Sequence, residues 1–165
     1  MLFNTIGIQV ASAGLKEALR NLIRLSFRIS GIKIAYPRAG QRIQASIPKG
    51  DDGYRCEIQG TLTRLKPGHE IWLLTQDITT GNVWPQDCGP VAYDRGQGTW
   101  SGLAFLSGKQ RLRIIAVSAP PTSQMLFRYW SSAASHNSWK PLGGRPSECT
   151  IYDQVEIDVE ITPSC

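Results

Sequence analysis

Hydrophobic and polar residues alternate along most of the chain after Gly31, which is the pattern of half-buried β-strands. The alternation is clearest over residues 151–161. Segment 32–47 has the same pattern, interrupted at residues 37–40, and we predict a single strand kinked in its middle. The other candidate strands are the short segment 91–93 and the longer segments 54–62, 70–75, 99–106 and 111–117. Turn residues separate these segments about every ten residues, so the sequence predicts a mainly β fold, an antiparallel β-sandwich of about seven strands over residues 31–165.

Residues 15–28 depart from this pattern, because their apolar side chains recur at helical spacing. The apolar side of the helical wheel includes Leu15, Leu19 and Leu22. The basic side includes Arg20, Arg24 and Arg28. We therefore predict an N-terminal amphipathic helical segment over residues 1–30, separate from the sandwich domain. We expect it to dock on protein or to mediate self-association, and binding to an anionic membrane surface is the alternative.

A second helical pattern lies before the last predicted strand, over residues 122–131. Its large side chains at helical spacing are Met125, Leu126, Tyr129 and Trp130. We expect a short helix that packs its aromatic side against the sandwich, because burial of aromatic surface stabilises such a contact.

Composition and charge narrow the expected partners and location. The chain has 165 residues, a formal net charge of +5 and a charged fraction of only 19%. The modest positive charge favours acidic partners, but the arginines are not interleaved with exposed aromatic residues, so we do not expect nucleic-acid binding. No apolar run reaches the roughly 20 residues of a membrane span and no secretory leader is recognisable. We expect a cytoplasmic protein, with peripheral membrane attachment as the alternative.

The residue types that usually carry catalysis or bind metals are few and scattered. No CxxC pair is formed by Cys56, Cys88, Cys149 and Cys165, and we expect mostly free thiols. The two histidines, His69 and His136, are expected to be solvated in loops. Glu156, Asp158 and Glu160 share one face of the last strand, and we interpret them as a solvated acidic face. We therefore predict no enzyme activity, no metal site and no cofactor.

Aromatic residues in loops are better candidates for recognition, since exposed rings beside polar groups stack on sugars and other ligands. Trp84 precedes Gln86 in an irregular segment, and Trp139 precedes Lys140 in a polar loop. These four residues are the candidate ligand-binding set. Packing in the core is the alternative for both tryptophans, and Trp72, in the middle of an apolar strand, is expected to be core.

From about residue 32 to residue 161 the chain resembles bacterial immunoglobulin-like β-sandwich modules. The resemblance is carried by segments 32–37, 71–74, 81–86, 98–100 and 114–117 and by a bend at Gly40. It implies an immunoglobulin-like fold and a role in recognition or assembly beside a catalytic, effector or membrane domain. An antibody-type sandwich would pair Cys56 with a cysteine on the penultimate strand, and residues 111–119 contain none.

These observations lead us to expect a non-catalytic recognition or assembly module that accompanies a bacterial effector, signalling or defence system. The N-terminal helix would mediate oligomerisation or docking to a protein partner. The alternatives are a peripheral membrane protein held by that helix and a β-sandwich that binds carbohydrate or another ligand.

Overall fold

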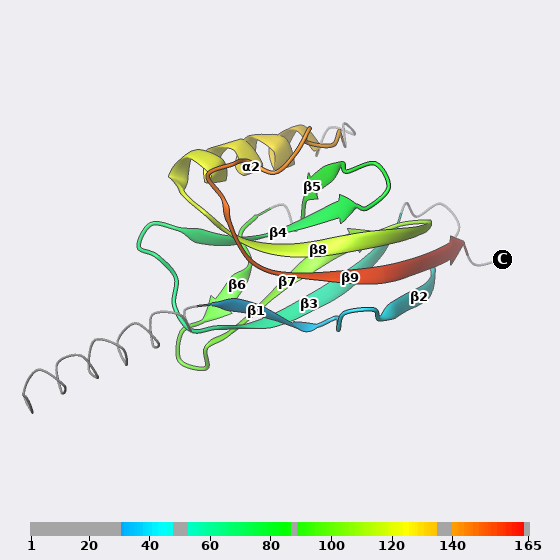
Figure 1. Ribbon diagram of the computed structural model, residues 1–165, viewed down its shortest axis with the longest axis horizontal. Helices are drawn as coiled ribbons and strands as arrows, with labels where there is room; N and C mark the ends of the chain where they lie inside the picture. Colours follow the sequence, from blue (N-terminus) through cyan, green and yellow to red (C-terminus); the bar gives the residue numbers. More distant parts are fainter. Residues whose placement is uncertain (1–30, 48–52, 87–88, 135–139, 164–165) are drawn as a thin grey trace, which may run out of the picture. The chain divides into compact units, whose positions relative to one another are not determined.

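Two β-sheets pack face to face, with the apolar side chains of each sheet turned toward the other (Figure 1). The computed structural model describes residues 31–47, 53–86, 89–134 and 140–163. The four-stranded sheet has the order β1 (Ile32–Tyr36), β3 (Tyr54–Leu62), β7 (Thr99–Leu106) and β6 (Ala92–Asp94). The five-stranded sheet has the order β2 (Arg42–Ile47), β9 (Thr150–Pro163), β8 (Lys109–Ala119), β4 (Glu70–Asp77) and β5 (Val83–Pro85). The prediction of a mainly β fold is confirmed.

The segment predicted as one kinked strand forms two strands that belong to different sheets. β1 pairs antiparallel with β3, whereas β2 pairs parallel with β9. The connection contains Pro37 and Gly40, and the φ angle of 74° at Gly40 lies in the left-handed region that glycine adopts at little steric cost. The prediction of a purely antiparallel sandwich was wrong at the β2–β9 pair. Side-chain alternation has the same period in parallel and antiparallel strands, so it does not carry strand direction.

The described part of the chain forms nine strands, two more than the predicted number of about seven. The division of the first strand adds one of them, and the three-residue strand β5 adds the other. A strand of three residues is too short to establish a period of two in the sequence, so the alternation of side chains did not predict β5.

The inward-facing residues of both sheets form what we call the inter-sheet core. Its fully buried members include Ile32, Ile58, Leu106, Ile114 and Ile157. The buried indole of Trp100 lies against Gly60 on the neighbouring strand β3. A Cβ atom on Gly60 would lie 2.2 Å from that indole and 2.1 Å from the carbonyl oxygen of Lys33. Gly60 therefore allows both the tryptophan and the β1 backbone to approach β3 closely.

Helix α2 (Pro121–Ala134) connects β8 to β9 and covers part of the outer face of the five-stranded sheet (Figure 1). The helix predicted over residues 122–131 is thus present and slightly longer. Beneath it lies a second cluster, the helix core, formed by Trp72, Leu74, Val83, Ile115, Val117, Ala119, Phe127 and Cys149. The ring centroids of Trp72 and Phe127 lie 5.1 Å apart at an interplanar angle of 47°. Trp72 is buried as predicted, under the helix rather than between the sheets.

Helix α2 buries only part of the aromatic side that was predicted to pack on the sandwich. Phe127 and Trp130 are buried, with exposed fractions of 0% and 8%. The side chains left exposed are Met125 at 67%, Leu126 at 43% and Tyr129 at 76%. The expectation that the aromatic side of the helix would pack on the sandwich is right for Trp130 and wrong for Tyr129. Both sets recur at helical spacing, so the pattern alone does not select the packed face.

The N-terminal segment, residues 1–30, lies outside the described residues. The predicted docking residues Leu15, Leu19, Leu22, Arg20, Arg24 and Arg28 therefore lie outside them as well. Gly31–Cys165 form a compact unit of their own. Within the described ranges, no helix is long and apolar enough to cross a membrane.

Candidate functional site

A cleft of about 410 Å³ lies between the two sheets, beside the edge strand β5. It is lined by Thr75, Trp84, Gln86, Phe105, Ser107, Gln110 and Leu112. These residues come from β4, β5, β7, β8 and the adjoining turns, so the fold brings together segments that are far apart in the sequence. Two of the four predicted ligand-binding residues, Trp84 and Gln86, line this cavity, which we call the Trp84 cleft.

Gln86 forms the floor of the Trp84 cleft and joins the two sheets. Its side chain is 4% exposed, and its Nε2 donates to Thr75 Oγ1 at 2.8 Å and to the Trp84 carbonyl oxygen at 3.3 Å. Its Oε1 accepts a hydrogen bond from the Phe105 amide at 2.7 Å. The amide nitrogen and oxygen of Gln86 therefore already have hydrogen-bond partners within the protein. This makes Gln86 a positioning residue rather than a direct ligand contact.

Trp84 is a half-buried aromatic residue among those that line this cleft. Its side chain is half-buried, and its Nε1 donor has no hydrogen-bond partner among the described residues. No charged side chain lines the cleft within the described ranges. The polar groups beside it are the Ser107 hydroxyl and the Gln110 amide, whose Nε2 donates to the Ser107 carbonyl oxygen at 2.7 Å. The arrangement suits a neutral ligand that offers hydroxyl or amide groups.

The second predicted pair lies partly outside the described residues. Trp139 belongs to the segment that is not described, whereas Lys140 is exposed. The Lys140 carbonyl oxygen accepts a hydrogen bond from Trp130 Nε1 at 2.6 Å. Two residues further on, Leu142 forms an antiparallel bridge with Val83 of β5. The chain near Lys140 therefore runs along the same sheet edge as Trp84, but Lys140 does not line the Trp84 cleft.

Three lining residues of the cleft, Phe105, Ser107 and Gln110, were not among the sequence candidates. Phe105 lies on the face of β7 opposite Trp100 and is only half-buried, so it faces out of the inter-sheet core. A large aromatic residue at the outward position of an alternating strand was the available sequence signal. Ser107 and Gln110 carry no such signal, because short polar side chains near a turn are common.

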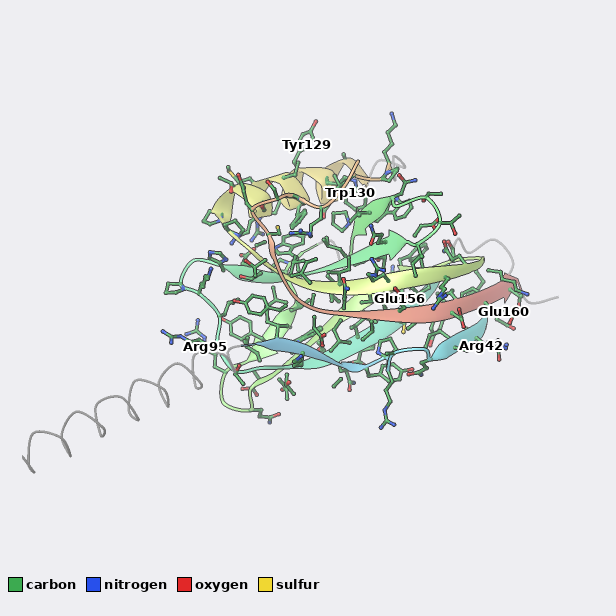
Figure 2. All side chains as sticks on the ribbon, viewed as in Figure 1. Arg42, Arg95, Tyr129, Trp130, Glu156 and Glu160 are labelled. Carbon is green, nitrogen blue, oxygen red and sulfur yellow. The ribbon has the colours of Figure 1, made fainter. Side chains whose placement is uncertain are left out.

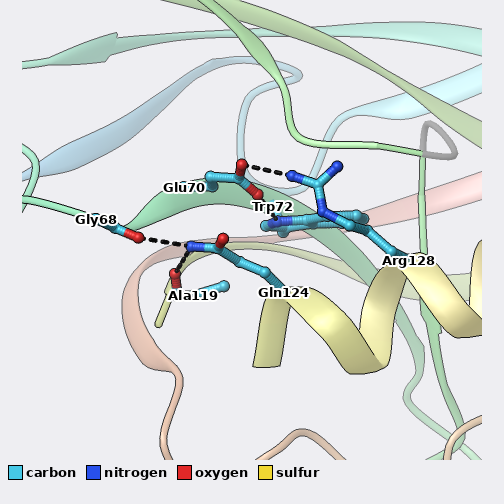
Figure 3. A network of polar contacts seen from close by, with 6 residues as sticks. All are labelled: Gly68, Glu70, Trp72, Ala119, Gln124 and Arg128. Atoms are coloured by element: carbon cyan, nitrogen blue, oxygen red, sulfur yellow. Dashed lines mark hydrogen bonds and ion pairs between the residues drawn. The ribbon is translucent and has the colours of Figure 1, made fainter. Parts of the chain in front are cut away.

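Polar contacts fasten α2 to the sheet beneath it (Figure 3). Gln124 Nε2 donates to the carbonyl oxygens of Gly68 at 2.8 Å and Ala119 at 2.9 Å. Arg128 forms an ion pair with Glu70 at 2.5 Å, and its guanidinium lies 5.9 Å from the Trp72 ring centroid. We call these contacts the α2 latch.

The outer face of α2 is a second candidate surface. Figure 2 shows Tyr129 pointing away from the sheet, whereas Trp130 lies on the side of the helix facing it. Together with Met125 and Leu126, Tyr129 forms an exposed apolar stripe along one helix. Contiguous apolar side chains at a surface mark contact sites for other molecules more often than single ones do.

Two of the acidic residues of β9, Glu156 and Glu160, have basic partners on β8, whereas Asp158 is exposed. Across the β8–β9 register, Glu156 faces Arg113 and Glu160 faces Lys109. Glu156 accepts ion pairs from Arg113 at 2.6 Å and from Arg111 at 3.1 Å, and the Lys109–Glu160 distance is 3.8 Å. We call this set the charge ladder. The acidic and basic side chains of the charge ladder balance one another's charge, so no metal ion is needed for that purpose.

The charge ladder perturbs the acidities of its carboxylates. The hydrogen bond from Arg113, supported by the nearby guanidinium charges and opposed by desolvation, lowers the pKa of Glu156. The hydrogen bond from Gln44 and the charge of Lys109 lower the pKa of Glu160. Both carboxylates therefore stay ionised to lower pH than an ordinary glutamate does.

His69 is the histidine that the structure describes, and it is not simply solvated. It is half-buried, and its Nδ1 lies 2.8 Å from the hydroxyl of the fully buried Ser118. Burial of both thiols raises the pKa values of Cys56 and Cys149, which are free in the structure. Among the residues that the structure describes, no group of three or more His, Cys, Asp or Glu side chains could hold a metal ion.

The chain matches no protein-family model and shows no significant similarity to a curated protein. A functional proposal therefore depends on the geometry of the described residues. The Trp84 cleft is the feature with the clearest chemistry, because it combines an accessible aromatic ring with uncharged polar groups.

Proposed function

We propose that the chain is a non-catalytic recognition module that binds a neutral, hydroxyl-rich ligand, as a carbohydrate presents, in the Trp84 cleft. The half-buried indole of Trp84 in an uncharged cleft carries the proposal. The indole face offers a stacking surface for the C–H face of a sugar ring. Trp84 Nε1, the Ser107 hydroxyl and the Gln110 amide would hydrogen-bond sugar hydroxyls around it.

The strand order supports an immunoglobulin-like version of this module. In variable-type immunoglobulin sandwiches, strands A, B, E and D form one sheet, and strands G, F, C and C′ belong to the other. The orders β1-β3-β7-β6 and β9-β8-β4-β5 match these two sets. Two features depart from the antibody pattern: β8 offers no cysteine to pair with Cys56, and Trp72 faces α2. As an accessory module, it would serve a bacterial effector, signalling or defence protein.

A glycan array probed with the purified full chain tests the cleft. We expect binding to a limited set of neutral glycans, and we expect Trp84→Ala to abolish it because the stacking surface is removed. Tyr36→Ala is the matched control, since Tyr36 is an exposed aromatic residue on β1 that does not line the cleft. Equal binding by the wild type and Trp84→Ala would exclude the cleft as the binding site.

A second candidate function, assembly with a second copy of this chain, is favoured by the exposed stripe on α2. The stripe consists of Met125, Leu126 and Tyr129. The helix has no acidic residue in its first turn and no basic residue in its last. Arg128 is paired with Glu70, so two copies meeting through this stripe would not oppose unpaired like charges.

Sedimentation velocity over a range of concentrations tests this assembly. We expect a concentration-dependent dimer in the wild type and a monomer in Met125→Glu, because a buried, unpaired carboxylate opposes association. Gln154→Glu is the control, since it adds the same charge at an exposed position on β9. A wild-type chain that stays monomeric at every concentration contradicts the assembly function.

A further inference from the structure

A second cavity, of about 500 Å³, lies at one end of the sandwich, between the β3–β4 and β6–β7 connections. We call it the loop pocket. It shares no lining residue with the Trp84 cleft. Figure 2 shows Arg95, which lines the loop pocket, at the opposite end of the molecule from Arg42 and Glu160. The loop pocket is thus a site of its own.

The charged side chains lining the loop pocket are mostly basic. Arg64, Lys66 and Arg95 contribute three positive charges, and Asp94 contributes the single negative charge. Asp94 Oδ1 is engaged within its own turn, where it accepts hydrogen bonds from the amides of Gly96 at 2.7 Å and Gln97 at 3.2 Å. The lining therefore has an excess of positive charge in a concave surface, which favours an anionic ligand.

Arg95 is held in place without being neutralised. Its Nε and Nη2 donate to the Tyr93 hydroxyl at 3.1 and 2.8 Å, and its guanidinium lies 5.5 Å from the Tyr93 ring centroid. Neither Arg95 nor Lys66 forms an ion pair within the described residues. A guanidinium has five N–H donors, so Arg95 keeps donors for a ligand after binding Tyr93.

Hydrogen bonds from three directions fix the walls of the loop pocket. The Leu62 amide donates to the Gly98 carbonyl oxygen at 2.8 Å and so ties the two connections together. Gln124 of α2 holds the Gly68 carbonyl oxygen at 2.8 Å, and His69 lies 2.8 Å from Ser118. A pocket whose backbone is already held loses less conformational entropy when a ligand binds.

We propose that the loop pocket binds a small, ring-bearing phosphomonoester, with Arg95 and Lys66 contacting the phosphate. Two cations without a carboxylate partner suit a dianionic group, and the guanidinium fork matches phosphate oxygens. Leu62, Leu65 and Pro67 are the apolar members of the lining and would form an apolar wall for the ring. The cavity volume lies within the range of small-molecule sites, roughly 300–1,000 Å³.

Titration of the ¹⁵N-labelled full chain, followed by amide chemical shifts at constant ionic strength, tests this site. The probes are inorganic phosphate and phenyl phosphate. We expect saturable shifts confined to residues 62–69 and 93–98, with tighter binding of phenyl phosphate because of the apolar wall. Arg95→Gln and Lys66→Gln are each expected to weaken phenyl phosphate binding about tenfold, as loss of a charge-assisted hydrogen bond predicts.

Arg42→Gln is the matched control, because it removes the same charge from an exposed arginine outside the loop pocket. We expect it to leave phenyl phosphate affinity unchanged. Shifts that do not saturate, or an equal loss of affinity in Arg42→Gln and Arg95→Gln, would overturn the site and indicate general charge attraction. Equal affinities for the two probes would overturn the contact between the ring and the apolar wall.

Discussion

The inter-sheet core and the helix core lie on opposite faces of the same strands, yet they are built differently. On β4, Ile71 and Leu73 point into the inter-sheet core, while Trp72 and Leu74 point under α2. Among the described residues, the inter-sheet core contains 18 buried residues contributed by both sheets, and the helix core contains eight. Removal of a large side chain should therefore cost more in the inter-sheet core.

The two cores also differ in what holds their layers together. The strands that enclose the inter-sheet core are joined to their neighbours by backbone ladders. The helix has no such ladder to the sheet, and its polar contacts include the α2 latch, formed by Gln124 and Arg128. Regions with fewer buried contacts open at lower free energy than the central strands. We expect the helix core to open before the inter-sheet core.

The largest effect is expected from Trp100→Ala, which removes an aromatic residue from the inter-sheet core. The loss of buried surface and the cavity left against Gly60 should lower the free energy of unfolding by about 5 kcal/mol. Urea unfolding followed by far-UV circular dichroism measures this change. Thr99→Ala on the same strand is the control, with an expected change within about 1 kcal/mol. A similar midpoint in the two variants would show that Trp100 does not anchor the core.

A smaller effect, confined to one layer, is expected from Phe127→Ala. This variant should lose about 3 kcal/mol of packing between α2 and the sheet. Cys149 lies in the helix core and Cys56 in the inter-sheet core, so their labelling rates report the opening of each. Because burial raises the pKa of both thiols, reaction at neutral pH requires local opening.

Thiol labelling read out by peptide mass spectrometry should therefore show faster reaction of Cys149 in Phe127→Ala and an unchanged rate at Cys56. Tyr129→Ala is the control, since its side chain is 76% exposed and its removal leaves the helix core intact. An equal acceleration at both cysteines would mean that the two cores unfold as one cooperative unit, and it would contradict the earlier opening of the helix core.

The α2 latch should contribute less than the apolar packing of the helix. Gln124→Ala removes two hydrogen bonds and should destabilise the helix layer by about 1 kcal/mol. Arg128→Ala should destabilise the helix layer by less, because the side chain of Arg128 is 53% exposed and exposed ion pairs contribute little to stability. The Cys149 labelling rate measures the destabilisation of the helix layer in each of these two variants. Gln154→Ala on β9 is the control. An equal Cys149 labelling rate in Gln124→Ala and Gln154→Ala would show that Gln124 does not help to hold the helix on the sheet.

The contrast between the cores explains which predictions from sequence succeeded. The strands of the inter-sheet core were predicted because burying one face imposes a period of two, as in residues 151–161. The helix between β8 and β9 was predicted from its period, but its orientation was not, because Phe127 and Tyr129 belong to two competing apolar faces. Which face is buried depends on the connections at both helix ends, which periodicity does not contain.

The candidate site was predictable only in part for a similar reason. The aromatic–polar pairing of Trp84 and Gln86 was visible in the sequence and both residues line one cleft, although Trp84 lies on strand β5 rather than in the expected irregular segment. Their partners Phe105 and Gln110 come from β7 and β8 through long-range pairing between segments. The parallel pairing of β2 with β9 was likewise missed, because a short segment does not encode which strand it joins.

The smallest effect concerns the charge ladder, on the part of the five-stranded sheet that carries ion pairs in place of a packed helix. Arg113 and Gln44 lower the pKa values of Glu156 and Glu160 in the folded chain relative to the ordinary value of 4.5. A carboxylate with a lowered folded pKa stabilises the fold above its unfolded pKa, and this contribution disappears as the pH falls through the folded pKa. We therefore expect an added loss of stability below about pH 4.5.

Thermal unfolding midpoints measured between neutral pH and the acidic range test this contribution. The double variant Glu156→Gln, Glu160→Gln should show a shallower fall in midpoint with decreasing pH than the wild type. The difference should be small and should shrink in high salt, because about a third of each side chain is exposed, 37% for Glu156 and 34% for Glu160. A steeper acid dependence in the double variant would contradict the sign, since it would require carboxylates that bind protons more tightly in the folded chain.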